Sequence, residues 1–530
     1  RQRQMCIRDS VAMTQSPTVH VSESSLFDDA GALARAIELL PEVIVDRRWF
    51  GAKTRTVSGM RIIDVIPLAN PDRVRLLLTV VTYSDGVADT YLLPVREVAE
   101  IADPTSLLLD LQYADGKSGY LIDALHDRDT ALALLEFIAT GSNCAGTKGT
   151  WRGVATRAFA EVRGTAPLEP KLWRREGSNS SISYGDRLML KVFRRPNRGV
   201  NPDWELGRYL TEEAHFPHAP RTAGALEYLD DEGFTRTIGL LQELVANEGD
   251  PRAQYMRDLE EYFASIASGS WSADDFAVTR RDWHLDNCTP PALARQLFES
   301  HLASAKLLGV RTAQMHQCIR FTVEYQESLH AATASQQRVV MELLELRKHL
   351  LPESARRRAD ALLSRGDAAF GNLDRVTEHP IHGIRIRVHG DYHLEQVLVS
   401  QGDFVILDFE GETSKPLSDR RITASPLKDV AGMIRSFDYA ARPTLDRTPT
   451  PDDPVLLAAC TFWTTWMGAS FLEGYLQEGA DTLLPEGPAA SELLLQNFLL
   501  EKAAYEVAYE LNNRPTWVEI PLRGIHDQLA

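Results

Sequence analysis

The chain has 530 residues, a length that predicts several domains rather than one compact core. Its 57 Lys and Arg against 74 Asp and Glu leave a formal net charge of −17, which argues against a general affinity for nucleic acid or other polyanions. Apolar residues make up 44% and charged residues 25%, as in folded soluble proteins, and no uncharged apolar run is expected to reach the ~18–20 residues that would span a membrane.

The cysteines indicate a reducing compartment. They are odd in number and scattered, and no two have the CxxC spacing of a zinc site: Cys6, Cys144, Cys288, Cys318 and Cys460. We therefore expect neither disulfides nor zinc, and a cytoplasmic protein. The first residues lack the apolar stretch of a signal peptide, and we expect residues 1–25 to form a disordered arm.

Residues 26–163 predict a small α+β subdomain, called the cap below. A helical pattern over 32–40 is followed by Pro41, which is expected to end that helix. Turn pairs such as Asn70-Pro71 separate short strand-like runs, and one further helix is expected: strands at 60–66, 74–83 and 90–94, and a helix around 127–140.

Residues 164–248 have the outline of a small nucleotide-binding lobe, the N-lobe. Strands are expected at 173–176, 181–184, 187–193 and 235–244. Between the last two, Asn201-Pro202-Asp203 is typical of a helix N-terminus, with Pro in the first turn. The order of strand, turn, strand, helix and strand is that of a lobe that holds a nucleotide.

Residues 249–530, the C-lobe, are mostly helical by pattern. Helices are expected at 254–268, 292–326, 330–351, 354–377, 427–440, 455–477 and 488–512. A short β-rich island interrupts them, from 384–388 through 397–399 to 404–408. The three regions together predict an α+β class: a bilobal, eukaryotic-kinase-like fold with an extra N-terminal α+β cap.

The β-rich island carries the most informative motif, His389-Gly390-Asp391 with Gln396, followed by Asp408-Phe409-Glu410. Phosphoryl transfer needs one carboxylate to receive the hydroxyl proton, and an amide oxygen with a second carboxylate to hold Mg²⁺ against the phosphates. The order and spacing match the catalytic loop and metal-binding Asp of kinases. We therefore predict Asp391 as the base, Gln396 and Asp408 as Mg²⁺ ligands, and Glu410 as a ligand of a second metal.

Two histidines flank the predicted base. His389 is expected to brace the loop, with direct proton transfer as the alternative. His393 could reach the active site and contact the acceptor, or it could be a packed loop histidine. A zinc site built on these residues is disfavoured, because the chemistry demands hard oxygen ligands.

The N-lobe contains candidate nucleotide contacts. The small-residue turn before the 181–184 strand can bring donors to phosphate oxygens, and a lysine within an apolar strand needs an anion. The predicted nucleotide residues are Ser178, Asn179, Ser180, Lys191, Glu205 as the ion-pair partner of Lys191, and Gln242, Glu243 and Val245 as the hinge beside adenine. The alternatives are an ordinary turn and a solvated helix carboxylate.

The last long helix is a candidate sugar site. Lys502, Tyr505, Glu506 and Tyr509 recur at spacings of three and four and so share one helix face. Asn513 and Arg514 follow just past it. Aromatic rings beside hydrogen-bonding groups suit a disaccharide, although by pattern alone a helix face packed on the lobe explains them equally well.

Longer motifs carry a resemblance to a known family. They are Arg48-Trp49-Phe50-Gly51-Ala52-Lys53, Ser178-Asn179-Ser180-Ser181 with Lys191, Gly199-Val200-Asn201-Pro202-Asp203-Trp204-Glu205, the 389–396 loop, Asp408-Phe409-Glu410-Gly411-Glu412, Ser425-Pro426-Leu427-Lys428-Asp429-Val430-Ala431-Gly432-Met433, and residues 502–515. From residue 26 to the C-terminus the chain resembles bacterial maltokinases, and it is similar to the kinase domain fused to trehalose synthase.

The resemblance implies a reaction and a pathway. It implies ATP and Mg²⁺ as cofactors, maltose as acceptor, and maltose 1-phosphate as product in the route from trehalose and maltose to α-glucan and glycogen, with trehalose synthase as a partner. The alternatives are a kinase of another sugar, amino sugar or aminoglycoside, and a catalytically silent module that binds trehalose synthase. The sequence departs from the family pattern at Gly177, at Glu395 and at Asp250-Pro251-Arg252.

Overall fold

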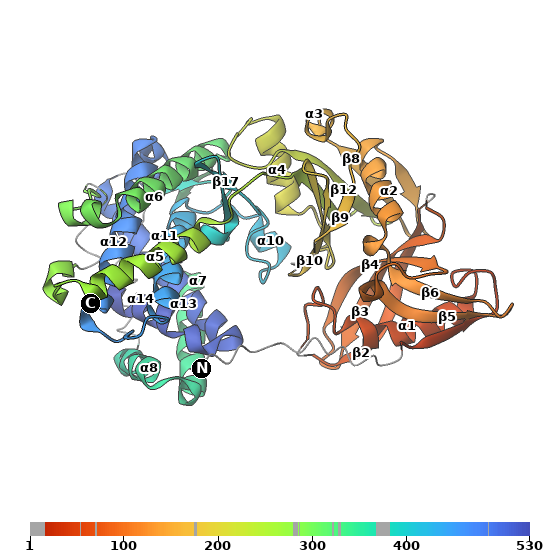
Figure 1. Cartoon of the computed structure of the whole chain (residues 1–530), viewed down its shortest axis with the longest axis horizontal. Coiled ribbons are helices and arrows are strands. Elements are labelled where there is room, and N and C mark those ends of the chain that lie inside the picture. The colour runs from red at the N-terminus through yellow and green to blue at the C-terminus, as the bar shows by residue number, and fades with distance from the viewer. Residues whose placement is uncertain are drawn as a thin grey trace. The chain divides into compact units, whose positions relative to one another are not determined.

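The computed structural model describes residues 16–53, 55–68, 71–173, 177–278, 285, 287–320, 323–326, 330–366, 382–485 and 487–529. The chain forms two compact units (Figure 1). Unit 1 comprises Arg1–Glu213 and Arg221–Val245, and unit 2 comprises Ala214–Pro220 and Ala246–Ala530. Unit 1 therefore holds residues 26–163 of the predicted cap and most of the predicted N-lobe, whose residues 214–220 and 246–248 belong to unit 2 together with residues 249–530.

The cap is built on a six-stranded sheet with the order β1-β5-β6-β4-β3-β2. Its strands are β1 (Thr18–Val21), β2 (Val57–Pro67), β3 (Val74–Tyr83), β4 (Ala88–Val98), β5 (Leu107–Tyr113) and β6 (Ser118–Asp123). The prediction of a disordered arm over 1–25 is wrong for β1, which pairs in parallel with β5. The reason is the alternation in this strand, because Val19 and Val21 are buried in the cap core.

Helix α1 (Ala30–Ile44) covers part of this sheet and continues through Pro41, which was expected to end it. Proline in a helix interior costs about 3 kcal/mol, since it removes one backbone hydrogen bond and crowds the preceding turn. Here Leu39, Leu40 and Ile44 pack in the cap core on both sides of the proline. Tertiary packing offsets the local penalty.

The N-lobe sheet has seven strands in the order β7-β8-β12-β13-β11-β10-β9. They are β7 (Asn143–Ala145), β8 (Gly149–Ala155), β9 (Pro170–Leu172), β10 (Asn179–Tyr184), β11 (Leu188–Phe193), β12 (Thr222–Asp230) and β13 (Thr235–Glu243). The boundary expected at residue 163 is therefore wrong for β7 and β8, which pair with β12 rather than with the cap. Most of the strand expected at 173–176 lies outside the described residues.

The two faces of the N-lobe sheet have different partners. One face, with Ile182, Leu190 and Val192, joins a core shared with α2 (Arg128–Ala139) and the cap sheet. On the other face, Phe193 and Leu240 pack with Trp204 of α4 (Pro202–Glu212). The short α3 (Phe159–Arg163) precedes β9. Since side chains alternate along a strand, β10 and β11 present one set to the cap and the other to α4.

Unit 2 is mainly helical. Its helices are α5 (Pro251–Ser268), α6 (Ala292–Cys318), α7 (His330–Arg347), α8 (Glu353–Arg365), α10 (Leu417–Arg420), α11 (Leu427–Leu445), α12 (Pro454–Gln477), α13 (Pro488–Asn513) and α14 (Glu519–Leu529). Two antiparallel pairs accompany them, β14 (Val323–Gln326) with β15 (His382–Arg385) and β16 (Val397–Ser400) with β17 (Asp403–Ile406). The helix expected over 292–326 is wrong at its end, where the chain forms β14.

Helices α6 and α12 pack tightly against each other in unit 2. A Cβ at Gly309 would lie 1.9 Å from the carbonyl oxygen of Phe471, and one at Gly474 would lie 1.9 Å from that of Lys306. Both positions therefore require glycine. Among the described helices α12 alone is long and apolar enough to cross a membrane, yet 78% of its most apolar window is buried inside the unit, as in a core helix.

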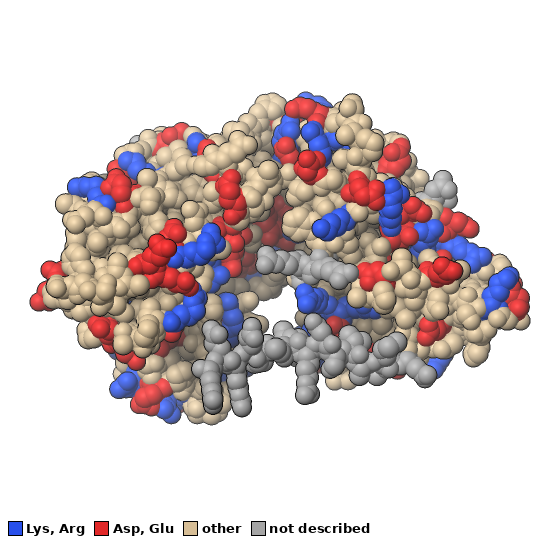
Figure 2. All heavy atoms as spheres, in the orientation of Figure 1, with Lys and Arg blue, Asp and Glu red and all other residues tan. Residues whose placement is uncertain are grey.

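On the face shown in Figure 2, acidic and basic side chains are interspersed over both units, and no extended basic patch appears among the described residues there. This distribution accords with the negative net charge of the sequence.

Candidate active site

The loop that carries Asp391 lies between β15 and β16 and is held by His389. The His389 Nε2 lies 2.7 Å from the carbonyl oxygen of Leu407, and its Nδ1 accepts a hydrogen bond of 3.4 Å from the Asp391 N–H. The ring is buried 5.1 Å from the rings of both Tyr392 and Phe409. Both ring nitrogens are engaged, and this geometry favours the bracing role over direct proton transfer.

Asp429, in the first turn of α11, binds the backbone of the same loop. Its carboxylate accepts hydrogen bonds from the N–H groups of His389 (2.7 Å) and Gly390 (2.9 Å) and lies 3.1 Å from His316 Nε2. The other nitrogen of His316 contacts the Tyr475 hydroxyl at 2.9 Å. Burial alone would raise the pKa of Asp429, but the hydrogen bond and charge of His316 outweigh it and hold that pKa below its usual value.

Asp429 belongs to the 425–433 motif of the sequence, but the sequence alone predicted no role for it. The available signal was an acidic residue followed by an almost uninterrupted apolar run, Val430-Ala431-Gly432-Met433. Gly432 completes the arrangement, because a Cβ there would lie 2.6 Å from the carbonyl oxygen of Tyr392. Helix α11 thus packs so close to the loop that no side chain fits at position 432.

We expect Asp429→Ala to lower the free energy of unfolding by about 3–5 kcal/mol, because two loop N–H groups and His316 lose a buried acceptor. Urea unfolding measures this change. The matched control is Asp258→Ala, which breaks a more exposed Asp–His pair with His301 (3.1 Å), and we expect a loss below about 1 kcal/mol there. Equal losses in the two variants would contradict the bracing role of Asp429.

Two of the predicted metal ligands, Gln396 and Asp408, flank the β16–β17 hairpin at its open end. Val397 pairs with Ile406, and the Leu407 N–H donates to the Gln396 carbonyl oxygen at 2.9 Å. Gln396 directly precedes β16 and Asp408 comes two residues after β17, so the two residues lie next to paired strand ends. Asp408 has a φ of +64°, a conformation uncommon outside glycine that often marks functional sites. The loops also approach at Gly390, where a Cβ would lie 3.3 Å from the Gly411 Cα.

The donor set at this end suits Mg²⁺. Within the described part of the chain, no three His, Cys, Asp or Glu side chains lie close enough to form a metal cage by themselves. An amide oxygen and a carboxylate fit Mg²⁺, which usually keeps water and phosphate oxygens as further ligands. Glu410 is buried with its carboxylate 3.9 Å from Arg420, so its predicted role at a second metal stays a prediction.

Asp391 opens into a cavity of about 320 Å³ that lies within unit 2. The cavity is also lined by most of the predicted sugar residues, namely His393, Lys502, Tyr505, Glu506, Tyr509 and Arg514, together with Arg252, Glu395, Glu412 and Glu510. Asn513 does not line it, and its amide donates to the Tyr509 carbonyl oxygen at 2.8 Å. Helix α13 therefore presents the predicted face to the predicted base, with Asn513 outside that face.

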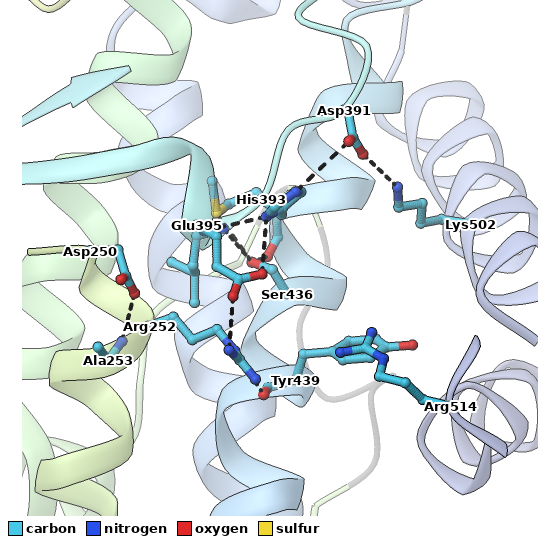
Figure 3. A network of polar contacts seen from close by, with 12 residues as sticks. Asp250, Arg252, Ala253, Asp391, His393, Glu395, Ser436, Tyr439, Lys502 and Arg514 are labelled. Carbon is cyan, nitrogen blue, oxygen red and sulfur yellow. Dashed lines mark hydrogen bonds and ion pairs between the residues drawn. The ribbon is translucent and has the colours of Figure 1, made fainter. Parts of the chain in front are cut away.

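Each carboxylate of the cavity has a cationic partner, and Figure 3 shows Asp391 with Lys502 and Glu395 with Arg252. Lys502 Nζ lies 3.4 Å from Asp391 and 3.8 Å from Glu412. The other pairs are Glu395 with Arg252 (2.9 Å), Glu506 with Arg435 (2.6 Å) and Glu510 with Arg514 (2.7 Å). Burial alone would lower the pKa of Lys502, but Asp391 and Glu412 outweigh it and raise that pKa. The lining holds five carboxylates and three cationic side chains and is therefore acidic, although every carboxylate is paired.

Aromatic rings and one neutral imidazole complete the lining. The rings of Tyr505 and Tyr509 are inclined by 28° with centres 6.5 Å apart, and the Lys502 ammonium lies 5.2 Å from the Tyr505 ring centre. His393 Nδ1 accepts from the Glu395 N–H at 3.3 Å, and its Nε2 lies 3.9 Å from Asp391. Burial lowers the pKa of His393, so the ring is neutral at neutral pH.

Two of the departures from the family pattern contact each other. Arg252, at the start of α5, pairs with Glu395 at 2.9 Å and also donates to the Tyr439 carbonyl oxygen at 3.2 Å (Figure 3). The charge that Glu395 adds to the loop is thus neutralised by the arginine that follows the hinge.

The predicted nucleotide residues lie in unit 1. Lys191 is directly opposite Ser181 in the β11–β10 pairing, so these two side chains share the α4 face of the sheet. Lys191 Nζ lies 3.4 Å from Asp203, the residue two positions before the predicted partner Glu205. Ser180 points to the opposite face, where its hydroxyl accepts from Arg194 at 2.8 Å. Ser181, rather than the predicted Ser180, therefore lies on the same face of the sheet as Lys191.

The hinge segment follows β13. The Leu244 N–H donates to the Arg187 carbonyl oxygen at 2.8 Å, and the Glu243 carboxylate binds Arg221 through two hydrogen bonds of 2.8 and 3.0 Å. The Glu243 side chain is thus engaged on the protein, and this arginine holds its pKa below the usual value. The roles of Gln242, Glu243 and Val245 beside adenine stay predictions.

Comparison with known proteins agrees with this architecture. Residues 44–127 match the family model of the maltokinase N-terminal cap domain. A glucosamine kinase from Streptacidiphilus jiangxiensis is 27% identical over 248 residues, 47% of this chain and 54% of that protein. One from Mycolicibacterium smegmatis is 25% identical over 155 residues, 29% of this chain and 36% of that protein. The matched region spans at most about half the length of these curated relatives.

Solved structures show the same fold. Glucosamine kinase in complex with glucosamine, ADP and inorganic phosphate has a TM-score of 0.58 at 18% identity, covering 92% of this chain and 99% of that chain. Crystal form B of glucosamine kinase has a TM-score of 0.59 at 19% identity, with 92% and 98% covered. The chain thus has a kinase-like α+β fold. More particularly, its fold is that of the solved glucosamine kinases, and residues 44–127 match the maltokinase N-terminal cap domain. The cap and the kinase-like fold are those that the resemblance to maltokinases implied.

Proposed function

We propose that this chain is an ATP-dependent sugar kinase that transfers a phosphoryl group to the anomeric hydroxyl of maltose. One observation carries the proposal: Asp391 of the kinase-like loop and the Lys502–Tyr505–Tyr509 face of α13 line a single cavity. A carboxylate at the wall of a pocket with aromatic and hydrogen-bonding groups fits a base that faces a sugar hydroxyl.

In this proposal each side chain has a defined task. Asp391 accepts the proton of the attacking hydroxyl and orients it, and Lys502 holds that carboxylate from the side. Gln396 and Asp408 hold Mg²⁺, which when bound offsets phosphate charge. In unit 1, Lys191 binds nucleotide phosphates, with Ser178, Asn179 and Ser181 beside it. The use of ATP is supported by the ADP and inorganic phosphate named in the structure of the related fold.

The pairing of the cavity carboxylates favours a neutral sugar. An ammonium group on the acceptor would need a carboxylate to itself, whereas all five cavity carboxylates are paired with Lys or Arg of this chain. Maltose offers hydroxyl groups and apolar ring faces, which suit paired polar groups and the Tyr505 and Tyr509 rings. The names of the relatives support glucosamine as the second candidate acceptor.

A panel of acceptors tests the proposal. Maltose, glucose, glucosamine and an aminoglycoside are each incubated with ATP and Mg²⁺, ADP release is followed, and the position of the phosphate is read by NMR. We expect the highest kcat/KM with maltose and a phosphate at the anomeric carbon. A higher value with glucosamine would overturn maltose as the substrate, and no ADP release with any acceptor would favour the silent module that binds trehalose synthase.

Substitutions on the predicted sugar-binding face of α13 should weaken acceptor binding without changing nucleotide binding. We expect Tyr505→Ala and Arg514→Ala to raise the KM for maltose about threefold to tenfold while the KM for ATP stays unchanged, because the lost contacts are ring and hydrogen-bond contacts to the sugar. Steady-state kinetics on the folded fraction measures both. Asn513→Ala, at the same helix end but outside the cavity, is the control. An unchanged maltose KM in both test variants would remove α13 from the acceptor site.

A further inference from the structure

Arg194 is a deeply buried charged residue that the proposed reaction does not use. It follows β11 directly, and its side chain is 1% exposed. A guanidinium in such a place is costly unless it is paired and hydrogen-bonded. Its Nη2 donates to Asp123 at 2.6 Å, its Nε donates to Ser180 at 2.8 Å, and its centre lies 4.7 Å from the ring of Trp49.

These partners come from two sheets of unit 1. Asp123 ends strand β6 of the cap, and Trp49 belongs to the cap motif Arg48-Trp49-Phe50-Gly51-Ala52-Lys53, for which the sequence indicated no chemistry. Ser180 is the second residue of β10 in the N-lobe sheet. Arg194 therefore links the cap to the start of β10 through a buried polar network, within one compact unit.

The backbone around Arg194 is docked on the cap as well. The Leu92 N–H of β4 donates to the Arg194 carbonyl oxygen at 2.9 Å. The next residue, Arg195, pairs with Asp89 at 2.6 Å, and a Cβ on Gly51 would lie 2.6 Å from its guanidinium. Gly51 of the cap motif thus lies directly against the Arg195 side chain. The Arg194 segment is consequently rigid on the cap side.

Among the described residues, the nucleotide side of the link has no comparable contacts with the cap. Ser178 and Asn179, the proposed phosphate contacts, come immediately before Ser180. Gly177 and Ser178 are exposed, and a Cβ on Gly177 would meet no atom within 4 Å. The buried hydroxyl of Ser180, bound to Arg194, is therefore an anchor adjacent to a loosely packed turn.

We propose that Arg194 is a positioning residue for nucleotide binding: it couples the cap, through Asp123 and Trp49, to the turn at 177–181 and so sets the affinity for ATP. This inference rests on the proposed function of that turn. It gives the cap a task in catalysis, namely to hold the phosphate-binding backbone in its bound conformation before the nucleotide arrives, which lowers the entropy lost on binding.

Two mild substitutions, one on each side of the link, test the coupling in the full chain. Ser180→Ala removes the N-lobe partner, and Asp123→Asn keeps the shape of the cap partner without its charge. We expect each to raise the Kd for ATP, titrated without sugar, about threefold to tenfold, with an unchanged KM for the sugar. The double variant should weaken ATP no more than the stronger single variant, because both act through Arg194. Arg194→Met is not used, because it would leave Asp123 as a buried charge without its ion-pair partner.

Tyr184→Phe is the matched control. It removes a buried hydroxyl at the other end of the same strand, where Tyr184 donates to the Ala131 carbonyl oxygen at 2.7 Å. We expect it to lower Tm and leave the Kd for ATP unchanged.

The outcomes are distinct. Lower Tm with an unchanged Kd for ATP in both test variants would overturn the proposal and make Arg194 purely structural. Multiplied effects in the double variant would also overturn it, since Ser180 would then act independently of the cap. A native chain that binds no ATP would overturn the proposed function itself.

Discussion

Asp391→Asn is expected to lower kcat for sugar phosphorylation about 10²–10⁴-fold, the usual contribution of a positioned base. The amide keeps the shape of the side chain but cannot accept the hydroxyl proton. It also loses the charge that attracts Lys502 at 3.4 Å, which further loosens the alignment of the acceptor. The Kd for ATP should stay within about twofold, since the nucleotide residues lie in unit 1. Single-turnover kinetics and nucleotide titration measure the two effects separately.

The control for this variant is Asp419→Asn, the same change at an exposed aspartate of α10 in the same unit, which should keep native kinetics. Retention of more than about a tenth of native kcat by Asp391→Asn would exclude Asp391 as the base.

Asp408→Asn should abolish the dependence of ATP binding on magnesium and lower kcat at least about 10²-fold, as expected when a charge at the transferring phosphoryl group is lost. Asparagine is chosen over alanine because it tolerates the φ of +64° at this position, so the change removes charge without new backbone strain. Titration of ATP with and without Mg²⁺ measures the effect.

Asp403→Asn is the control within the same hairpin. It weakens the ion pair with Arg311 (2.7 Å) and should reduce stability while magnesium still tightens ATP binding. If magnesium tightened ATP binding in Asp408→Asn as strongly as in the native chain, Asp408 would not be the metal ligand.

Local patterns predicted the elements near the site well. The strand expected at 74–83 is β3, and the helices expected at 455–477 and 488–512 are α12 and α13 within one residue at each end. These segments have strong hydrophobic periodicity, which depends only on neighbours in the sequence. The motif at 389–396 and the 404–408 strand likewise placed the proposed base and one metal ligand in adjacent loops.

Other features depend on residues distant in sequence and escaped prediction. The β7–β8 hairpin pairs with β12, and Arg252 neutralises Glu395 from 143 positions away. Ser180 and Ser181 have the same residue type, so only the register with β11 decides which of them faces Lys191. A one-residue shift exchanges the two faces of a strand, and composition carries no record of that choice.

The sequence by itself thus determined the class of fold, the loop with Asp391, and the shared face of Lys502, Tyr505 and Tyr509, because short-range spacing defines all three. Only the tertiary structure decided that this face and Asp391 line one cavity, that Asp429 holds the loop, and that Arg194 joins the cap to β10. A buried charge needs an ion-pair or hydrogen-bond partner nearby. Which residue supplies that partner depends on how the chain packs, and not on the order of residues along it.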